Sequence, residues 1–306
     1  IGGGVFAAHA ENEIRELADL MQIPVITTMM GISVFPDDDQ LFCGMIGTHG
    51  VKMANAAVNE CDVLFLVGAR VGDRAVKTPL ALEKTTKIIH IDIDPAEIGK
   101  NIGADLPLVG DAKLVLQQMT ELAKPMKHDE WIAHIKTLGG ERKYVEPAKG
   151  TVNPRVFIDR LAKKMPANVT VVADVGQNQI WTCTEYKFRK EGRLLTSGGM
   201  GTMGYSVPAA IGAKMADNSR ATVAICGDGA FQMSFMELAT AVQFGVDIKV
   251  VVMTNNRLGM VRELQTNGYH DRQTAVFLDG SPDFIKLAEA YGIPAMRVYD
   301  DDTMEK

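Results

Sequence analysis

The sequence has no long apolar run, no excess of positive charge and no paired cysteine motif. Its apolar stretches fall well short of the ~20 residues that a membrane helix needs, which argues against a membrane span. The 306 residues carry a formal net charge of −6 and show no basic cluster, so a nucleic-acid-binding surface is not expected. The four cysteines lie apart without CxxC or zinc-site spacing, and reduced thiols in a cytoplasmic protein are the simplest interpretation.

The chain also lacks an initiator methionine and a strand ahead of its first glycines. It starts at Ile1 and enters a glycine turn, Gly2–Gly4, that would normally follow a strand. It ends at Lys306, shortly after another strand-like segment. These ends predict an internal piece of a longer polypeptide. What is present, 46% hydrophobic and 23% charged residues over 306 positions, is typical of a globular protein with about two domains.

The glycines at the start resemble a dinucleotide-binding turn only weakly. Gly2-x-Gly4-x-x-Ala7 fits that fingerprint loosely. The fingerprint also requires an acidic residue about 20 positions later, at the end of the next strand. The next expected strand, residues 23–27, is followed by Thr28 and Met29, so NAD binding is not supported and a structural turn is the better interpretation.

Apolar runs and helix-like periodicity alternate along the chain, which predicts an α/β protein with two Rossmann-like, doubly wound parallel-sheet domains. The first domain is expected over residues 1–124, followed by a linker, residues 125–152, with one helix around Trp131. The second domain is expected over residues 153–306 and begins with Asn153-Pro154, an N-cap followed by proline at the first helical position. Expected strands are residues 23–27, 62–67, 87–93, 106–109, 169–173, 222–226 and 248–253.

The stretch between residues 221 and 260 predicts a strand–helix–strand unit. Its two apolar, β-branched runs, residues 222–226 and 248–253, are typical of buried strands. Between them the sequence predicts one apolar helix face, made of Phe235, Leu238, Ala239 and Val242. The helix should begin near Phe231 and offer its N-terminal amides to an anion. Two strands joined by such a crossover are expected to be parallel.

Asp228 and Asn255 each follow one of these strands. Parallel pairing places both at the carboxyl edge of the sheet, where ligands bind in open α/β folds. A carboxylate and an amide oxygen aimed at one point suit a hard divalent cation such as Mg²⁺. A cation beside a helix N-terminus indicates a diphosphate or a similar group.

Gly227-Asp228-Gly229, followed further along by Asn255-Asn256, resembles the signature of the thiamine-diphosphate enzymes. The resemblance implies that Asp228, Asn255 and the main-chain carbonyl of Arg257 hold Mg²⁺ on the diphosphate of the cofactor. Thr254 departs from the usual asparagine at its position but removes no metal ligand. The alternative is a plain strand–helix–strand unit with glycine and asparagine in its turns.

Along its whole length the sequence resembles the large catalytic subunits of acetolactate synthase, also called acetohydroxyacid synthase. The stretches that carry the resemblance are residues 28–31, 47–50, 67–70, 73–74, 90–94, 174–179, 196–204, 227–229, 255–256, 282–284 and 287–289. Such enzymes have three α/β domains, so the chain is expected to hold the middle domain and most of the cofactor domain. They decarboxylate pyruvate and condense the two-carbon unit with a second 2-keto acid. The products, 2-acetolactate or 2-aceto-2-hydroxybutyrate, serve branched-chain amino-acid biosynthesis.

The resemblance implies a thiamine-diphosphate site in the second domain. Its residues are Val175, Gly176, Gln177, Asn178, Gly201, Thr202, Met203, Gly227, Asp228, Gly229, Ala230, Asn255 and Met260. Met203 matches the bulky apolar residue that holds the cofactor in its bent, reactive shape and is one catalytic candidate. The alternative is that this methionine only fills space beside the glycines. Asn178 stands where histidine is more usual.

The resemblance also implies an FAD site in the first domain. Its residues are Gly3, Gly4, Thr28, Met29, His49, Gly68, Arg70, Asp73, Arg74, Asp92, Ile93 and Asp111. Asp111 is also expected to cap a helix, and Arg70 can neutralise a pyrophosphate. From the residues alone, Arg70, Asp73 and Arg74 could form a solvated ion-pair loop, and His49 a satisfied loop histidine. Arg74 matches an arginine at the mouth of the substrate channel, which makes it the second catalytic candidate.

Active sites of this family form between chains, which implies a homodimer or homotetramer and a small regulatory subunit as a further partner. The glutamate that activates the cofactor belongs to the N-terminal domain, so this piece alone is expected to be inactive. Leu264 stands where many members have a channel-lining tryptophan, which implies altered selection of the second keto acid and weak binding of sulfonylurea-type inhibitors. The alternatives are another thiamine-diphosphate carboligase or decarboxylase, such as glyoxylate carboligase, and a non-catalytic nucleotide-binding module.

Overall fold

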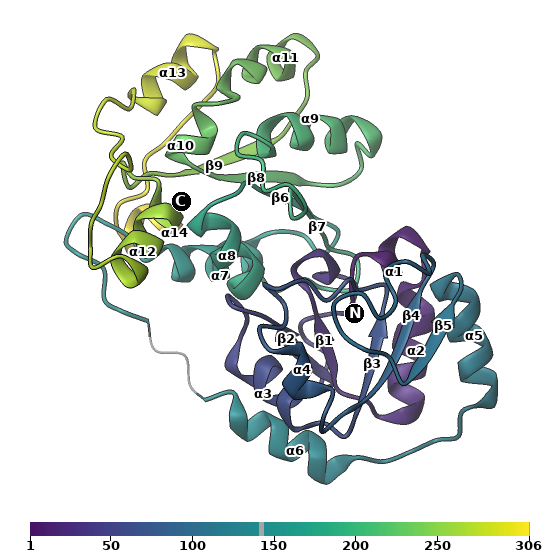
Figure 1. Cartoon of the computed structure of the whole chain (residues 1–306). Helices are drawn as coiled ribbons and strands as arrows, with labels where there is room; N and C mark the ends of the chain where they lie inside the picture. The colour runs from purple at the N-terminus through teal and green to yellow at the C-terminus, as the bar shows by residue number, and fades with distance from the viewer. Residues whose placement is uncertain (141–143, 306) are drawn as a thin grey trace. The chain divides into compact units, whose positions relative to one another are not determined.

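The computed structural model describes residues 1–140 and 144–305, and the chain divides into two α/β units at residue 142 (Figure 1). The helix expected in a linker, α6 (Asp129–Leu138), packs within the first unit. Its Ile135 is buried in a cluster with Cys43 and Ala57, and Trp131 packs against the same cluster. The apolar side of this helix therefore covers the first unit, because amphipathic helices are stabilised by burying that side.

The first unit contains two parallel sheets with helices around them. Its strands are β1 (Val25–Thr27), β2 (Phe42–Met45), β3 (Val63–Val67), β4 (Lys87–Asp92) and β5 (Leu106–Val109). Besides α6, its helices are α1 (Gly4–Ala7), α2 (Glu11–Met21), η1 (Met29–Gly31), α3 (Lys52–Glu60), α4 (Pro79–Leu82) and α5 (Ala112–Leu122). β1 pairs with β2, and β3, β4 and β5 form the second sheet in that order. All these pairs are parallel, which confirms the expected sheet type.

Ile1 and Gly2 join the two sheets of the first unit. Ile1 N donates to Ile26 O at 2.8 Å, and Thr28 N donates to Ile1 O at 2.9 Å. On the other side, Gly2 N donates to Val67 O at 2.9 Å. The backbone of residues 1–2 therefore occupies the position of a strand between β1 and β3 and brings their carboxyl ends together.

The apolar face of α2 fills part of the first unit's core. Ile14 and Leu17 are buried, as their helical spacing predicts. They belong to one cluster with Val67 of β3, Ile91 of β4 and Leu116 of α5. Because this cluster joins α2 and α5 to β3 and β4, it fixes the two helices against the sheet.

The second unit is one parallel sheet in the order β7-β6-β8-β9. Its strands are β6 (Thr170–Ala173), β7 (Arg193–Thr196), β8 (Thr222–Gly227) and β9 (Lys249–Met253). Its helices are α7 (Pro154–Lys164), α8 (Gln177–Glu185), α9 (Ser206–Ala216), α10 (Asp228–Phe231), η2 (Phe235–Glu237), α11 (Leu238–Gln243), α12 (Gly259–Gly268), α13 (Phe284–Ala290) and α14 (Asp301–Glu305). Figure 1 shows α9, α10 and α11 on one face of the sheet and α7 and α8 on the other.

The start of α7 and the lengths of the helices follow from local sequence. Asn153 caps α7 as expected, because its Oδ1 accepts from Arg155 N at 3.0 Å while Pro154 takes the first helical position. The helices are short, and the longest described ones, such as α2 and α9, have 11 residues. Nowhere in residues 1–140 and 144–305 does a helix reach the length and apolarity needed to cross a membrane.

The crossover between β8 and β9 differs from the single helix that the sequence predicts. The chain turns into α10 directly at Asp228 and leaves the helical region at Ser234, whose φ is −143°. A 3-10 turn and α11 follow, and the break resets the helical phase. Leu238 is therefore buried, whereas Ala239 is exposed and Val242 is 52% exposed. The expected apolar face is wrong at these last two positions, while the parallel pairing of β8 and β9 is confirmed.

Leu116→Ala should destabilise the first unit by roughly 2–5 kcal/mol, because Leu116 is fully buried and its truncation leaves a cavity. Leu122→Ala on the same helix is the matched control: Leu122 is 84% exposed, and its loss should change stability by less than ~0.5 kcal/mol. Denaturant unfolding followed by circular dichroism measures both variants. Equal losses would contradict the packing of α5 described above.

Candidate functional site

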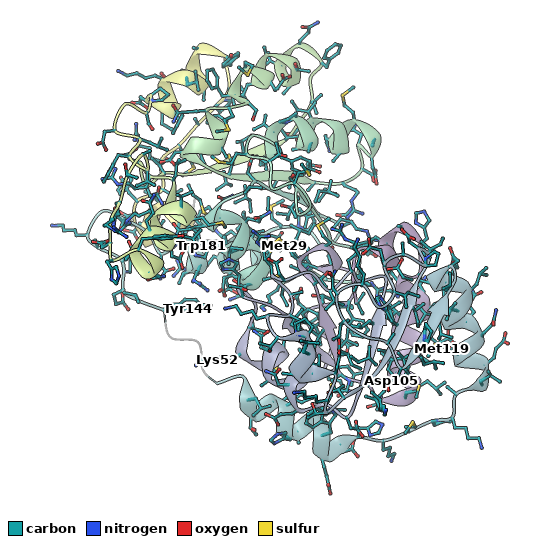
Figure 2. All side chains as sticks on the ribbon, in the orientation of Figure 1. Met29, Lys52, Asp105, Met119, Tyr144 and Trp181 are labelled. Carbon is teal, nitrogen blue, oxygen red and sulfur yellow. The ribbon has the colours of Figure 1, made fainter. Side chains whose placement is uncertain are left out.

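A groove of about 1760 Å³ runs along β9 and takes in the carboxyl edge of the second sheet. The strand register brings three loops to this edge, because Ala173 pairs with Ile225 and Gly227 pairs with Met253. The loops after β6, β8 and β9 therefore begin side by side. Trp181 of α8, labelled in Figure 2, lines the same groove.

Most residues expected to bind the cofactor of the second unit, or its metal, line this groove. They are Val175, Gly176, Gln177, Asn178, Met203, Gly227, Asp228, Gly229, Ala230, Asn255, Arg257 and Met260. Gly201 and Thr202 lie outside the lining and close their own loop instead. Gly201 N donates to Ser197 O at 3.1 Å, and Thr202 N donates to Ser197 Oγ at 3.0 Å.

Asp228 joins the ends of β8 and β9. Its side chain is nearly fully buried, with 1% of the residue exposed. Oδ1 accepts from Gly229 N at 2.9 Å, and Oδ2 accepts from Asn255 N at 3.0 Å and Asn256 N at 2.5 Å. These bonds compensate the burial of the carboxylate. A carboxylate has about four acceptor positions, so three N–H donors leave room for a cation.

Asn255 and the main chain of Arg257 add further oxygen donors. Asn255 Oδ1 accepts from Arg257 N at 3.0 Å and retains a second acceptor position. The side chain of Arg257 is bound to other groups. Its Nη1 donates to Asn256 O at 2.6 Å and to Asp279 Oδ1 at 2.9 Å. Its guanidinium also lies 4.5 Å from the centre of the Phe277 ring. Carboxylate, amide and carbonyl oxygens are the donors that Mg²⁺ prefers. In the described part of the chain, no three His, Cys, Asp or Glu side chains form another candidate metal centre.

Sequence reasoning missed the segment that holds the Asn255–Arg257 loop. Leu258 N donates to Val276 O and Leu278 N donates to Asn256 O, both at 2.9 Å, which forms a short antiparallel bridge around Arg257. Val276 is fully buried and anchors this segment. The only signal in the sequence was the short apolar run of residues 276–278 among polar neighbours.

Two glycines let separate loops press together in the groove. A Cβ added to Gly229 would lie 3.5 Å from Met203 Cε, so Met203 lies over Gly229. A Cβ added to Gly259, the first residue of α12, would collide with Gln177 Oε1. Gln177 Nε2 in turn donates to Glu263 Oε2 of α12 at 2.9 Å. The structure thus brings Met203 and Gln177, from different loops, to the same groove.

Asn178 mainly connects strand ends. It is 3% exposed, and its Nδ2 donates to Asp174 O at 2.8 Å and to Ile225 O at 3.1 Å. Its Oδ1 faces a glycine, because a Cβ added to Gly227 would lie 3.3 Å away. The side chain therefore ties β6 to β8 beneath the groove, and only its oxygen faces the loop glycines.

Three buried cysteines, Cys43, Cys183 and Cys226, are held as protonated thiols. Burial raises the pKa of Cys43 to about 11 and that of Cys183 to about 12. Burial also raises the pKa of Cys226 at the end of β8, and the neighbouring carboxylates of Asp174 and Asp228 raise this pKa further. A protonated thiol is a poor nucleophile and a poor metal ligand, so these thiols supply no chemistry to the groove.

The residues expected to bind FAD lie at the carboxyl ends of the first unit's strands or in its first turn. They are Gly3, Gly4, Thr28, Met29 (labelled in Figure 2), His49, Gly68, Arg70, Asp73, Arg74, Asp92, Ile93 and Asp111. Gly68 has a φ of +57°, and a Cβ there would lie 2.7 Å from Gly4 Cα, so two main-chain segments meet at this point. Thr48 N donates to Arg74 O at 2.9 Å, which connects the loops after β2 and β3.

Some side chains of this set already have partners. Asp111 Oδ1 accepts from Lys113 N at 2.9 Å, which confirms the expected cap of α5. Asp73 and Arg74 form an ion pair at 3.8 Å with side chains 89% and 86% exposed, the solvated arrangement that the residues alone left open. Arg70 is exposed at the same edge.

Two family models match the chain, and the three relatives described below are each named as an acetolactate synthase large subunit. The central domain of thiamine pyrophosphate enzymes matches residues 1–119, and their C-terminal, thiamine-pyrophosphate-binding domain matches residues 174–306. The whole chain is 42% identical to the probable acetolactate synthase large subunit of Methanocaldococcus jannaschii and covers 53% of that protein. The chain is 36% identical to the acetolactate synthase large subunit of Lactococcus lactis, and the match covers 99% of this chain and 53% of the relative. It is 40% identical to the large subunit of Corynebacterium glutamicum, where the match covers 97% of this chain and 49% of the relative. The chain spans about half the length of these curated relatives.

Gly259→Ala should leave the protein less stable than Gly268→Ala, although both glycines lie in α12. A Cβ at position 259 displaces the Gln177 side chain and its bond to Glu263, which costs roughly 0.5–1.5 kcal/mol. A Cβ at position 268 meets nothing within 4 Å, so that variant gains helix propensity of up to about 1 kcal/mol. Denaturant midpoints compare the two. Similar midpoints would mean that Gly259 is not needed for the approach of Gln177.

Proposed function

This chain belongs to the thiamine pyrophosphate enzyme family, and we propose that the polypeptide containing it is an acetolactate synthase. In this proposal the enzyme decarboxylates pyruvate and condenses the two-carbon unit with a second 2-keto acid, for branched-chain amino-acid biosynthesis. The observation that carries the proposal is the junction of β8 and β9, where Asp228 accepts hydrogen bonds from the main chain of Asn255 and Asn256. The names of relatives that match the whole chain support the activity.

Asp228, Asn255 and the carbonyl of Arg257 would hold Mg²⁺ against the diphosphate of the cofactor. Their oxygens suit the ion, and Asp228 keeps an acceptor position after its three N–H bonds. Gly176 and Gly227 carry no side chain, so their main chain can approach a diphosphate closely. Bound thiamine diphosphate supplies the carbon centre at which a 2-keto acid loses CO₂.

Apolar side chains over the groove would keep water from the reacting carbon. Met203 lies over Gly229, and Leu258 and Leu278 approach the same glycine. We assign Met203 the task of supporting the cofactor from one side, because its Cε lies 3.5 Å from the position of a Cβ built on Gly229, beside Asp228. Exclusion of water also suppresses side reactions at such a site.

FAD is the second cofactor of this proposal, at the carboxyl edge of the first unit's sheets. Gly3, half-buried in the first turn, carries no side chain, so its main chain can approach a pyrophosphate closely. Arg70 offers a positive charge at that edge, and Asp92 ends β4 with a hydrogen-bond acceptor. Arg74, exposed further along the same loop as Arg70, would steer the carboxylates of keto acids.

The proposed partners are pyruvate, a second 2-keto acid and further protein chains. The words "large subunit" in the names of relatives support a small regulatory subunit. A homodimer or homotetramer in the cytoplasm completes the proposal. Leu264, 59% exposed on α12, is the residue proposed to select the second keto acid and to weaken binding of sulfonylurea-type inhibitors.

Asp228→Asn in the complete polypeptide should weaken Mg²⁺-dependent binding of thiamine diphosphate more than ~100-fold. Loss of a metal-binding charge should exceed the ~10–100-fold effect of losing an outer-shell partner. Tryptophan fluorescence, to which Trp181 in the groove contributes, reports binding when thiamine diphosphate is titrated with and without Mg²⁺. Circular dichroism checks that the variant is folded.

Asp159→Asn is the control for this titration, because Asp159 is ion-paired with Lys163 on α7 and should not affect the metal. The affinity of this variant for thiamine diphosphate should stay within about twofold of that of the parent protein, because an exposed ion pair contributes little. A parent protein that binds thiamine diphosphate equally well with and without Mg²⁺, or an Asp228→Asn variant with unchanged affinity, would refute the assigned site. Either result would favour a plain nucleotide-binding module or a different metal centre.

Arg70→Ala should lower FAD affinity of the complete polypeptide by ~10–100-fold, because a charge-assisted hydrogen bond is worth about 1.5–3 kcal/mol. Lys77→Ala, an exposed position in the same loop region, is the control and should retain FAD. Flavin absorbance after reconstitution and gel filtration measures both. If the parent protein retains no flavin after reconstitution, the FAD assignment is wrong.

A further inference from the structure

Asp174 is a fully buried carboxylate directly after β6. Its Oδ1 accepts from Val175 N at 2.9 Å and from Gly204 N at 2.9 Å, and its Oδ2 accepts from Ser206 N at 2.8 Å. The first donor belongs to the loop that Asp174 itself begins. The other two belong to the loop between β7 and α9. One side chain therefore joins two of the loops that border the groove.

The bond to Gly204 acts on the peptide unit that carries Met203. Gly204 N and the carbonyl of Met203 belong to one planar group, so fixing the amide fixes the direction in which the chain leaves Met203. Gly204 has a φ of +85°, and a Cβ there would lie 2.9 Å from Met233 Cβ, so the turn is confined on its other side as well. Met203 is thereby held over Gly229, next to Asp228.

The bond to Ser206 supplies a helix cap that the local sequence lacks. Ser206 is the first residue of α9, and the preceding Tyr205 makes no capping bond with its side chain. The first amides of a helix have no partner within the helix and favour a nearby negative charge. Asp174 meets this need from another strand and so fixes where α9 begins.

The main chain of Asp174 connects the same residue to the loop before Asp228. Asp174 N donates to Ile225 O at 2.8 Å, two residues before the start of the Gly227-Asp228 turn. Asn178 Nδ2 donates to Asp174 O at 2.8 Å and also to Ile225 O at 3.1 Å. The distance between the Met203 loop and the Asp228 turn is therefore set through Asp174.

We propose that Asp174 is a positioning residue of the cofactor site, which holds Met203 at a fixed place relative to the Asp228 turn. The inference rests on the proposed function, because it assigns Met203 contact with thiamine diphosphate. Asp174 itself touches neither metal nor substrate. An amide in its place keeps one oxygen acceptor and turns an NH₂ group toward a backbone N–H, so Gly204 or Ser206 loses its partner.

The test is Asp174→Asn in the complete polypeptide, with Asp217→Asn as the matched control. Asp217 caps the opposite end of α9, where it accepts from Ser219 N at 3.1 Å, and its loss should leave catalysis within about twofold of the parent. Asp174→Asn should raise the dissociation constant of thiamine diphosphate or lower kcat by ~10-fold or more. In a Met203→Ala background most of this effect should disappear, because the side chain being positioned is gone.

A purely structural role gives a different pattern. The folded fraction of Asp174→Asn would then keep the parent's kcat and cofactor affinity, and any loss would add to that of Met203→Ala; this outcome overturns the inference. A parent polypeptide that binds no thiamine diphosphate overturns the proposed function instead.

Hydrogen exchange of the parent protein keeps the inference testable if Asp174→Asn does not fold. The amides of Gly204 and Ser206 should be protected without added cofactor, because Asp174 already holds them. The amide of Thr202, which is bonded only to the exposed Ser197 loop, serves as the internal reference. Free exchange at Gly204 and Ser206 in the cofactor-free protein would show that Asp174 does not fix this loop.

Discussion

A carboxylate removed from water must be surrounded by donors, and the groove of the second unit is arranged around two such groups. Asp228 collects amides from its own turn and from the end of β9, and Asp174 collects amides from its own turn and from the start of α9. Each bond ties a loop to the carboxyl end of a buried strand. Leaving one of these groups without donors would cost several kcal/mol, so the loops are held together even though none of them is a regular element.

Close approach of separate segments at glycines is the second constraint, and both units depend on it. In the first unit Gly4 and Gly68 meet with no space for a side chain, and in the second Gly259 leaves room for the side chain of Gln177. The two units therefore share one arrangement, a parallel sheet whose carboxyl edge carries segments that meet at glycines.

Family membership and geometry support each other at different levels. The matched domains account for parallel sheets and for a thiamine pyrophosphate site in general. The geometry adds which oxygens are available to a metal ion. Asp228 and Asn255 each retain an acceptor position. The side chain of Arg257 is bound to Asp279 and Phe277, so this residue offers only its carbonyl. The reaction proposed for the whole polypeptide draws on both, since a hard cation needs those oxygens and the relatives' names supply the chemistry.

The sequence by itself determined the described strands other than β2 and β7, the caps at Asp111 and Asn153, and the neighbourhood of Asp228 and Asn255. These features depend on side-chain periodicity and on contacts within a few residues, which a linear pattern records. Only the tertiary structure decided the break at Ser234, the support of Arg257 by residues 276–278 and the bonds from Asp174 to Gly204 and Ser206. Each of these is a hydrogen bond or a packing choice between segments that meet only after the sheet has formed, and no local pattern encodes which amide a buried carboxylate will face.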